Sequence, residues 1–288
     1  MLLIFGLGYA GQAIARAARA GGMRVLATTR GAARGPDLIG FASAAPAIAA
    51  ATHLLSTVPP DAAGDPVLAC HGAAIAAALR HGGLRWLGYL SSTVVYGDRG
   101  GGWVSEATPP APSGSRGERR LAAEAAWRAT AGAGALDLFR LAGIYGPGRS
   151  AFDDLRAGRA RRVVKPGHAF GRIHRDDIAR AVLAAIARPA RQAPDGARVL
   201  NLTDDAPAES VETIAYAAAL LGLPAPAPVP FAVAQAAMSP MARSFWAENR
   251  KVGCAATRAA LGIAWRHPTY REGLAAILAE ERDQHGLK

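Results

Sequence analysis

Short apolar runs alternate with longer segments of helical character along the first half of the chain. The apolar runs predict strands at 2–5, 24–29, 53–58, 85–92 and 136–146, the last ending in a turn. The segments between them predict helices at 9–20, 65–83 and 117–131. Because consecutive strands separated by helices pair side by side as parallel strands, this order predicts a parallel sheet with helices on both faces.

The second half of the chain has a looser pattern. A late strand is predicted at 198–204 and an amphipathic helix at 209–222, which ends at a glycine. Residues 223–231 are proline-rich and extended, and 232–288 predict further helices. The predicted fold class is therefore α/β, a doubly wound parallel sheet with a small C-terminal lobe.

Composition excludes several classes of protein. The chain has 288 residues, of which 51% are hydrophobic, enough for a sizeable core. Cys70 and Cys254 lie far apart and show no metal or redox spacing, so we predict no metal site and a reducing, cytoplasmic setting. The N-terminus lacks the basic segment of a signal peptide, and no apolar run has the length of a membrane span, so we expect no membrane partner.

The net charge of +11 comes almost entirely from arginine, because the chain has lysine only at Lys165, Lys251 and Lys288. The arginines are scattered and form no basic run interleaved with aromatic residues. This distribution argues against a nucleic-acid partner. We expect a small-molecule substrate, anionic in character, instead.

The stretch GLGYAG follows the first predicted strand and opens the first predicted helix. In a dinucleotide-binding turn, Gly6 makes the tight bend, Gly8 lets a pyrophosphate approach the backbone, and Gly11 lets the helix pack on the strand. The amides around Tyr9 and Ala10 then face the anion. This context favours a Rossmann-type nucleotide site over the alternative that the glycines serve only the turn.

The end of the second predicted strand indicates which dinucleotide to expect. A site for NAD usually has an acidic residue there, but this chain has none before Asp37. Arg30 and Arg34, helped by the Thr29 hydroxyl, suit a 2′-phosphate, so we predict NADP in preference to NAD. Arg34 has the alternative of being a solvated loop charge. Thr57, at the end of the third predicted strand, is a further candidate contact to the cofactor.

Four later stretches resemble the extended short-chain dehydrogenase/reductases, in the order of that family. They are YLSSTVVYGD (89–98), FRLAGIYGPGR (139–149), GRIHRDDIARAVLAAI (171–186) and RVLNLTDDAPAESVETIAYAAALLG (198–222). The resemblance implies nucleotide-sugar epimerases, dehydratases and reductases as relatives.

The resemblance also implies a division of the chain. Residues 1–148, completed by 171–204, would form the NAD(P)-binding Rossmann domain. Residues 149–170 and 205–288 would form the substrate-binding lobe and the C-terminal helices. A homodimer through the helix 117–131 is the candidate oligomer, with Trp127 either at that surface or in the core.

The family's acid is missing from this chain. Relatives place a Ser or Thr four residues before a VYG tyrosine, here Ser92 before Tyr96, and then a Tyr-x-x-x-Lys pair with a Glu four residues later. Alignment on Glu124 puts Arg120 at the Lys position and Arg116 at the Tyr position. An arginine keeps its proton at neutral pH and cannot replace the tyrosine. The chain therefore resembles an atypical group within the family that lacks the pair. Gly143 is another departure, since many relatives have an Asn there.

Two interpretations of this helix remain open. Ser115 and Glu118 have the spacing of a capping box, so the arginines could be a solvated first turn. Alternatively, Arg116 or Arg120 binds the phosphate or carboxylate of a ligand.

Two functions follow from these alternatives. In an NADP-dependent oxidoreductase or epimerase, Ser92 would hold the reacting oxygen, Thr93 would be a second hydroxyl, and Tyr96 is the nearest phenol. His174 and Asp176 offer further acid–base capacity. Three more arginines are candidates for a substrate phosphate: Arg149, Arg172 and Arg175. In the other function, the protein is a non-catalytic NADP-binding sensor or scaffold.

Overall fold

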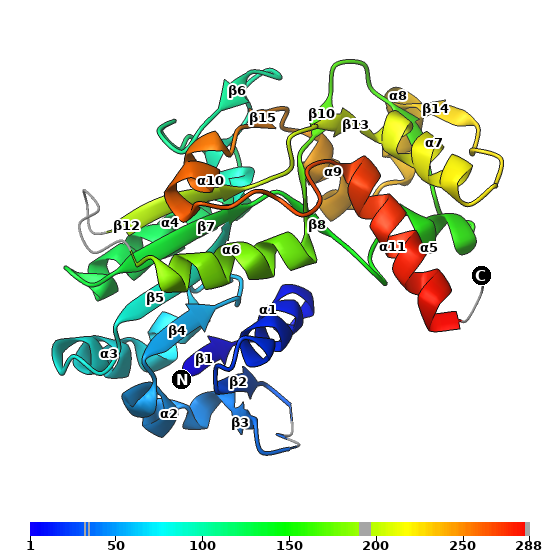
Figure 1. Cartoon of the computed structure of the whole chain (residues 1–288). Helices are drawn as coiled ribbons and strands as arrows, with labels where there is room; N and C mark the ends of the chain where they lie inside the picture. The colour runs from blue at the N-terminus through cyan, green and yellow to red at the C-terminus, as the bar shows by residue number, and fades with distance from the viewer. Residues whose placement is uncertain (32, 34, 190–196, 286–288) are drawn as a thin grey trace.

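A parallel sheet of seven strands forms the centre of the computed structural model, which describes residues 1–31, 33, 35–189 and 197–285 (Figure 1). The strand order is β12-β7-β5-β4-β1-β2-β3, and all neighbouring strands are parallel. The strands are β1 (Leu2–Phe5), β2 (Val25–Thr29), β3 (Leu38–Gly40), β4 (His53–Ser56), β5 (Trp86–Ser92), β7 (Leu136–Leu141) and β12 (Ala197–Leu202). The strand order reverses between β1 and β4, where doubly wound sheets bind their ligands. The predicted fold class is confirmed.

Alternate residues of the strands face different helices. In β1, Leu2 and Ile4 pack in one core with α1 (Tyr9–Ala20) and α6 (Arg175–Ala187). Leu3 and Phe5 pack in a second core with helices from the other face. Those helices are α2 (Ala45–Ala50), α3 (Pro66–Arg80) and α4 (Ser115–Ala131). Because both faces are covered, all four residues of β1 are fully buried, which explains its uninterrupted apolar sequence.

A smaller lobe lies at one end of the sheet (Figure 1). Its helices are α5 (Ala151–Arg156), α7 (Ser210–Leu220), α8 (Phe231–Ala234), α9 (Pro240–Trp246) and α11 (Tyr270–His285), with the 3₁₀ turn η4 (Gln235–Ala237). Short ladders accompany them: β8 (Gly143–Tyr145) with β11 (Arg172–His174), β9 (Arg162–Val164) with β14 (Pro228–Pro230), and β10 (Ala169–Phe170) with β13 (Ala208–Glu209). Phe152, Ala217, Tyr270 and Leu274 form part of a separate apolar core, so this lobe is packed in its own right.

The segment between α9 and α11 returns to the sheet. β15 (Lys251–Val252) pairs with β6 (Trp103–Val104), and α10 (Ala255–Leu261) follows. Cys254, Leu261 and Trp265 join the core of α1 and α6. Part of the range 205–288 therefore packs against the sheet and not in the smaller lobe.

The structure differs from the sequence pattern in two places. β3, the 3₁₀ turn η1 (Phe41–Ser43) and α2 lie in a region that the apolar runs do not predict, because each contains only three to six residues. The N-cap of α4 is Gly114, so Ser115 is already helical and the expected capping box is wrong. A Cβ on Gly117 would lie 2.7 Å from Pro112 Cβ and 2.9 Å from the Val94 carbonyl oxygen, so the first turn of α4 packs closely on this segment.

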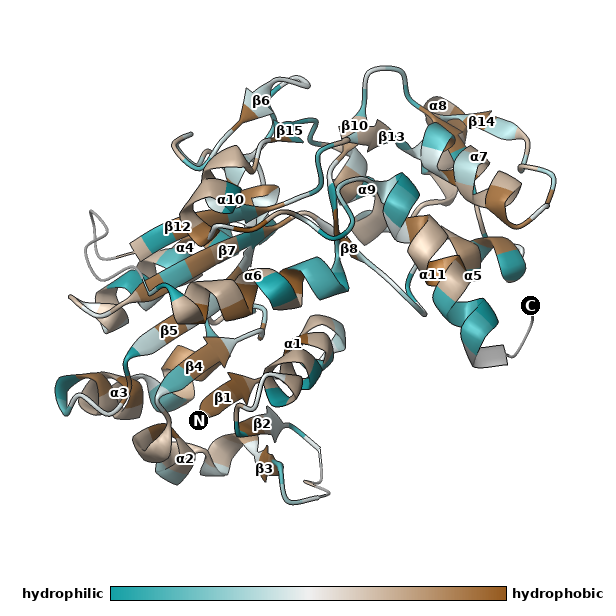
Figure 2. Cartoon of the chain, in the orientation of Figure 1, coloured by the Kyte–Doolittle hydropathy of each residue, from teal (hydrophilic) through white to brown (hydrophobic). Residues whose placement is uncertain are grey.

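Hydropathy follows the layers of the fold. Figure 2 shows β1 and β3 brown along their lengths, whereas the last turns of α11 are teal. Among the helices that the structure describes, none combines the length and apolar character needed to cross a bilayer.

Candidate functional site

The glycine turn is held by contacts between the ends of β1 and β4. Gly6 has a φ of +87°, and its amide donates to Thr28 Oγ1 at 3.2 Å. Thr57 Oγ1 donates to the Gly6 carbonyl oxygen at 2.8 Å, and a Cβ on Gly6 would lie 2.8 Å from that hydroxyl. A Cβ on Gly11 would lie 2.5 Å from the Gly6 carbonyl oxygen. Glycine is therefore required at both positions for geometric reasons, and Thr57 stabilises the turn itself.

The start of α1 is open to a ligand. Gly8 is the exposed N-cap, and a Cβ there would meet nothing within 4 Å. Tyr9 and Ala10 are the first helical residues, so their amides lack partners within the helix. Such amides attract an anion. The Tyr9 side chain turns away and donates from its hydroxyl to the Pro147 carbonyl oxygen at 3.0 Å.

Among the described residues, no carboxylate accepts a hydrogen bond from the end of β2 or forms an ion pair with Arg30. Thr29 Oγ1 accepts from the Gly31 amide at 3.2 Å, and Arg30 is exposed. Asp37 forms an ion pair with Arg19 at 3.2 Å, so the first acidic residue after the strand is already engaged. Arg34, the other predicted phosphate contact, lies outside the described residues.

A cavity of about 860 Å³ lies at the carboxyl ends of β5 and β7, against the smaller lobe. Four of the predicted residues line it together: Ser92, Thr93, Arg116 and Arg120. Gly143, Arg149 and Arg172 line it as well, whereas Tyr96, His174, Asp176 and Arg175 are not among its lining residues. The lobe contributes Phe170, Phe245, Glu248 and Arg250, among others. Neither Phe245 nor Arg250 was among the predicted site residues.

The two arginines of α4 that line the cavity have different environments. Arg120 Nη1 donates to the Leu90 carbonyl oxygen at 2.8 Å and to the Tyr89 hydroxyl at 3.1 Å, so this guanidinium is bound to β5. Arg116, one turn earlier, lies 4.6 Å over the ring of Phe245. Burial, followed by the charge of Arg120, lowers the pKa of Arg116, and no carboxylate within the described residues forms an ion pair with it. Arg116 is therefore the cation with capacity for a ligand.

The hydroxyl groups beside these arginines come from the end of β5 and the 3₁₀ turn η2 (Thr93–Tyr96). Ser92 is half-buried, and its Oγ accepts only from the Val94 amide at 3.3 Å, so its proton is available. Thr93 Oγ1 makes a long bond, 3.4 Å, to the Leu141 carbonyl oxygen.

Tyr96 is placed differently from these hydroxyls. It is fully buried, and its phenol donates to Asn201 Oδ1 at 2.7 Å. Burial raises the pKa of this phenol. The Tyr96 phenol is therefore engaged in the packing between β5 and β12 and does not reach the cavity.

Glu124 holds a buried charge network that the sequence did not reveal. Its carboxylate accepts from Arg140 Nε at 3.0 Å and Nη2 at 2.7 Å, and from Ser91 Oγ at 2.7 Å. Glu124 and Arg140 are both buried. The family's glutamate position is thus structural in this chain, since it fixes α4 against β5 and β7.

His174 and Asp176 lie behind the cavity at the start of α6. His174 is buried, its Nδ1 accepts from the Asp176 amide at 3.3 Å, and burial lowers its pKa to about 4. With His267, the two residues place potential ligand atoms within 4.8 Å of one another. The charges of Arg175 and Arg266 also act on this histidine and oppose a cation there.

Comparison with known proteins places this geometry among nucleotide-binding folds. No protein-family model matches the chain. Protein YeeZ of Escherichia coli strain K12 is 34% identical to this chain over 143 residues. The match covers 48% of this chain and 47% of YeeZ, so the chain spans about half the length of this curated relative. A functionally unknown conserved protein from Silicibacter pomeroyi is 43% identical, with a TM-score of 0.86 over 97% of this chain and 98% of that one. The human epimerase family protein SDR39U1, solved with NADPH, has the same fold, with a TM-score of 0.79 and 20% identity over 97% of this chain and 99% of that one.

Proposed function

We propose that this chain, whose motifs resemble the atypical extended short-chain dehydrogenase/reductases and which shares its fold with the human epimerase family protein, is a member of that group. It would bind NADP(H) at the glycine turn and act on a small anionic substrate, such as a nucleotide sugar, in the main cavity. Residues 1–148 and 171–204 would bind the cofactor, and 149–170 with 205–288 would hold the substrate. The NADPH complex of the human relative supports this cofactor. The exposed Arg30 supports it too, since a 2′-phosphate there meets no free carboxylate.

The observation that carries this proposal is the meeting of Ser92, Arg116 and Arg120 in one cavity. Arg116 is exposed on the first turn of α4, and its guanidinium lies 4.6 Å over the ring of Phe245, which comes from the opposite lobe. A guanidinium that lines the cavity and forms no ion pair within the described residues is prepared to pair with a carboxylate or phosphate.

The chain's own residues would orient the substrate. Ser92 Oγ would donate a hydrogen bond to the reacting oxygen, and Arg116 would hold the anionic group. Hydride transfer is the chemistry that a bound nicotinamide supplies. Tyr145, which also lines the cavity, is a poor acid, because burial raises the pKa of its phenol far above neutrality. The proton would therefore come from solvent or from a group of the substrate, passed through the Ser92 and Thr93 hydroxyls.

The second function, a non-catalytic NADP-binding sensor or scaffold, also has an observation in its favour. Arg120 is bound to β5 as a structural residue and does not restore the lost lysine. An intact nucleotide turn beside a cavity that lacks the family's Tyr-x-x-x-Lys pair is what this function expects.

Turnover distinguishes the two functions. We would follow NADPH oxidation against small carbonyl compounds and keto-sugars, each with and without a carboxylate or phosphate. We expect activity on anionic members only, a loss of about 100-fold in kcat for Ser92→Ala, and a rise of about tenfold in KM for Arg116→Gln. Arg119→Gln, which changes an exposed arginine of the same helix, is the matched control and leaves both constants unchanged. Tight NADPH binding without turnover of any compound would favour the sensor or scaffold.

A further inference from the structure

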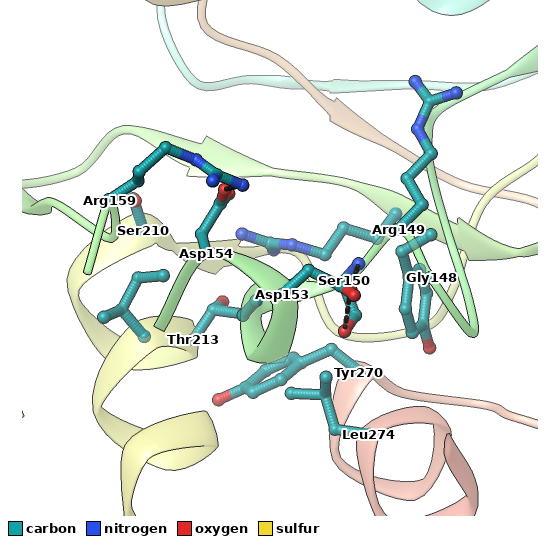
Figure 3. Close-up of a pocket in the computed structure, with 14 residues that line it drawn as sticks. Gly148, Arg149, Ser150, Asp153, Asp154, Arg159, Ser210, Thr213, Tyr270 and Leu274 are labelled. Atoms are coloured by element: carbon teal, nitrogen blue, oxygen red, sulfur yellow. Dashed lines mark hydrogen bonds and ion pairs between the residues drawn. The ribbon is translucent and has the colours of Figure 1, made fainter. Parts of the chain in front are cut away.

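A second cavity, of about 430 Å³, lies inside the smaller lobe between α5, α7 and α11 (Figure 3). Thr213 and Ile214 of α7 line it, with Tyr270 and Leu274 of α11. The volume suits a small organic molecule. Much of the remaining wall is polar and comes from the segment that follows β8, including Arg149, Ser150, Asp153 and Asp154.

The two carboxylates of this cavity are already engaged. Asp153 Oδ2 accepts from the Ser150 amide at 2.7 Å and from Ser150 Oγ at 2.9 Å, as the cap of α5. Asp154 pairs with Arg159 at 3.2 Å. Figure 3 shows the guanidinium of Arg149 extending away from these two pairs. Asp154 is therefore paired with a cation, whereas Asp153 caps α5. The wall also has a cation that forms no ion pair within the described residues.

Arg172 is such a cation. It lines this cavity from β11, and its Nη1 donates to the carbonyl oxygens of Phe170 at 2.9 Å and Ala208 at 3.3 Å. Within the described residues no carboxylate comes within ion-pair distance of its guanidinium. Burial lowers the pKa of Arg172, and the charge of the nearby Asp204 carboxyl acts in the opposite direction. A partly buried charge of this kind is stabilised by an anion.

We propose that the cavity between α5, α7 and α11 binds a small organic anion, with its phosphate or carboxylate at Arg172 and its apolar part against Tyr270 and Leu274. The site goes beyond the proposed function, because it needs neither the cofactor nor Ser92. Tyr145, Arg149 and Arg172 line both cavities, so the two sites adjoin at this wall. Arg149, whose guanidinium lies 5.5 Å from the ring of Tyr9, is a second cation on the shared wall.

The test is calorimetric titration of the full chain with inorganic phosphate and, separately, with malonate. We expect binding of at least one, and the comparison identifies which group the site prefers. Arg172→Gln removes the charge, and Ile214→Trp fills the cavity without changing any charge. Each should weaken binding about tenfold or more. Arg116→Gln alters only the main cavity and should leave anion binding to the second cavity unchanged.

Thermal melting of every variant shows whether it is folded. If Arg172→Gln does not fold, two other single variants replace it in the test. Arg172→Lys keeps the charge of the site, and Ile214→Trp removes the space of the cavity. No binding of either anion at millimolar concentration would overturn the proposal. Binding that persists in Ile214→Trp, or that is lost only in Arg116→Gln, would overturn it as well, because the anion would then lie elsewhere.

Discussion

At the scale of single residues, the replacement of the family's Tyr and Lys by two arginines has produced two different side chains. They lie on the same face of α4, one turn apart, and the sequence alone treats them as equivalent. The structure separates them, since Arg120 donates to Leu90 and Tyr89 whereas Arg116 stacks on Phe245. One guanidinium is structural and the other is available to a ligand.

This difference predicts that substitutions of the two arginines affect stability to different extents. Arg120→Gln should lower the free energy of unfolding by about 1–2 kcal/mol, because the Leu90 carbonyl loses a charge-assisted hydrogen bond. Arg116→Gln should change it by less than about 0.5 kcal/mol. Urea denaturation of the two variants measures both values. Equal effects of the two substitutions would show that Arg116 is structural as well.

Asp204 predicts a pH dependence. This carboxyl is buried, its Oδ2 has no hydrogen-bond partner, and burial raises its pKa to about 7. In the unfolded chain an Asp titrates near pH 4, so between about pH 4 and 7 the folded state binds a proton that the unfolded state has lost. The contribution of this group to stability therefore decreases as the pH rises through that window.

Asp204→Asn isolates the effect, since the amide keeps the acceptor for the Arg172 amide and cannot ionise. Relative to the wild type, the variant should gain stability between pH 5 and pH 8, as measured by urea denaturation at both values. A stability difference that is the same at both pH values would mean that Asp204 is ionised in the folded protein.

At the scale of elements, the glycine turn gives a matched pair of substitutions. A Cβ on Gly11 would press on the Gly6 carbonyl oxygen, whereas a Cβ on Gly8 would enter open space. Gly11→Ala should therefore destabilise the fold by about 1–3 kcal/mol, because β1 and α1 must separate. Gly8→Ala should leave stability unchanged but weaken NADPH binding, because the methyl group occupies the space of the pyrophosphate. Thermal melting and NADPH titration of both variants separate the roles, and a destabilised Gly8→Ala would contradict this assignment.

The elements also show how far the sequence was informative. Strands of four or more buried residues and the glycine turn were predictable, because their signals are local. The start of α4 was not, because the contact of Gly117 with Pro112 and Val94 depends on how a distant loop folds back. The Glu124–Arg140 pair was missed for the same reason, since β7 and α4 meet only through the sheet. The residues of the candidate site that came from motifs were found, and Phe245 and Arg250 were not.

At the scale of the whole molecule, the sheet and the smaller lobe enclose the main cavity between them. The end of β5 and the turn η2 supply the hydroxyls and α4 supplies two arginines, while α9 supplies Phe245 opposite Arg116. Trp127 of α4, the candidate dimer helix, is fully buried, and its Nε1 donates to Asp65 Oδ2 at 2.9 Å. This tryptophan therefore belongs to the core.

In both proposed functions, the main cavity works beside a bound nucleotide. Cofactor binding is therefore the claim on which the rest of the function depends.

The measurement that tests this claim most directly is a fluorescence titration of the purified protein with NADPH and with NADH, in the wild type and in Arg30→Asp. We predict that NADPH binds more tightly than NADH, and that the substitution weakens NADPH about tenfold or more while NADH changes little, because the new carboxylate repels the 2′-phosphate. If neither nucleotide binds, both proposed functions are wrong and only the fold remains. If NADH binds as tightly as NADPH and Arg30→Asp has no effect, the assignment of NADP is wrong.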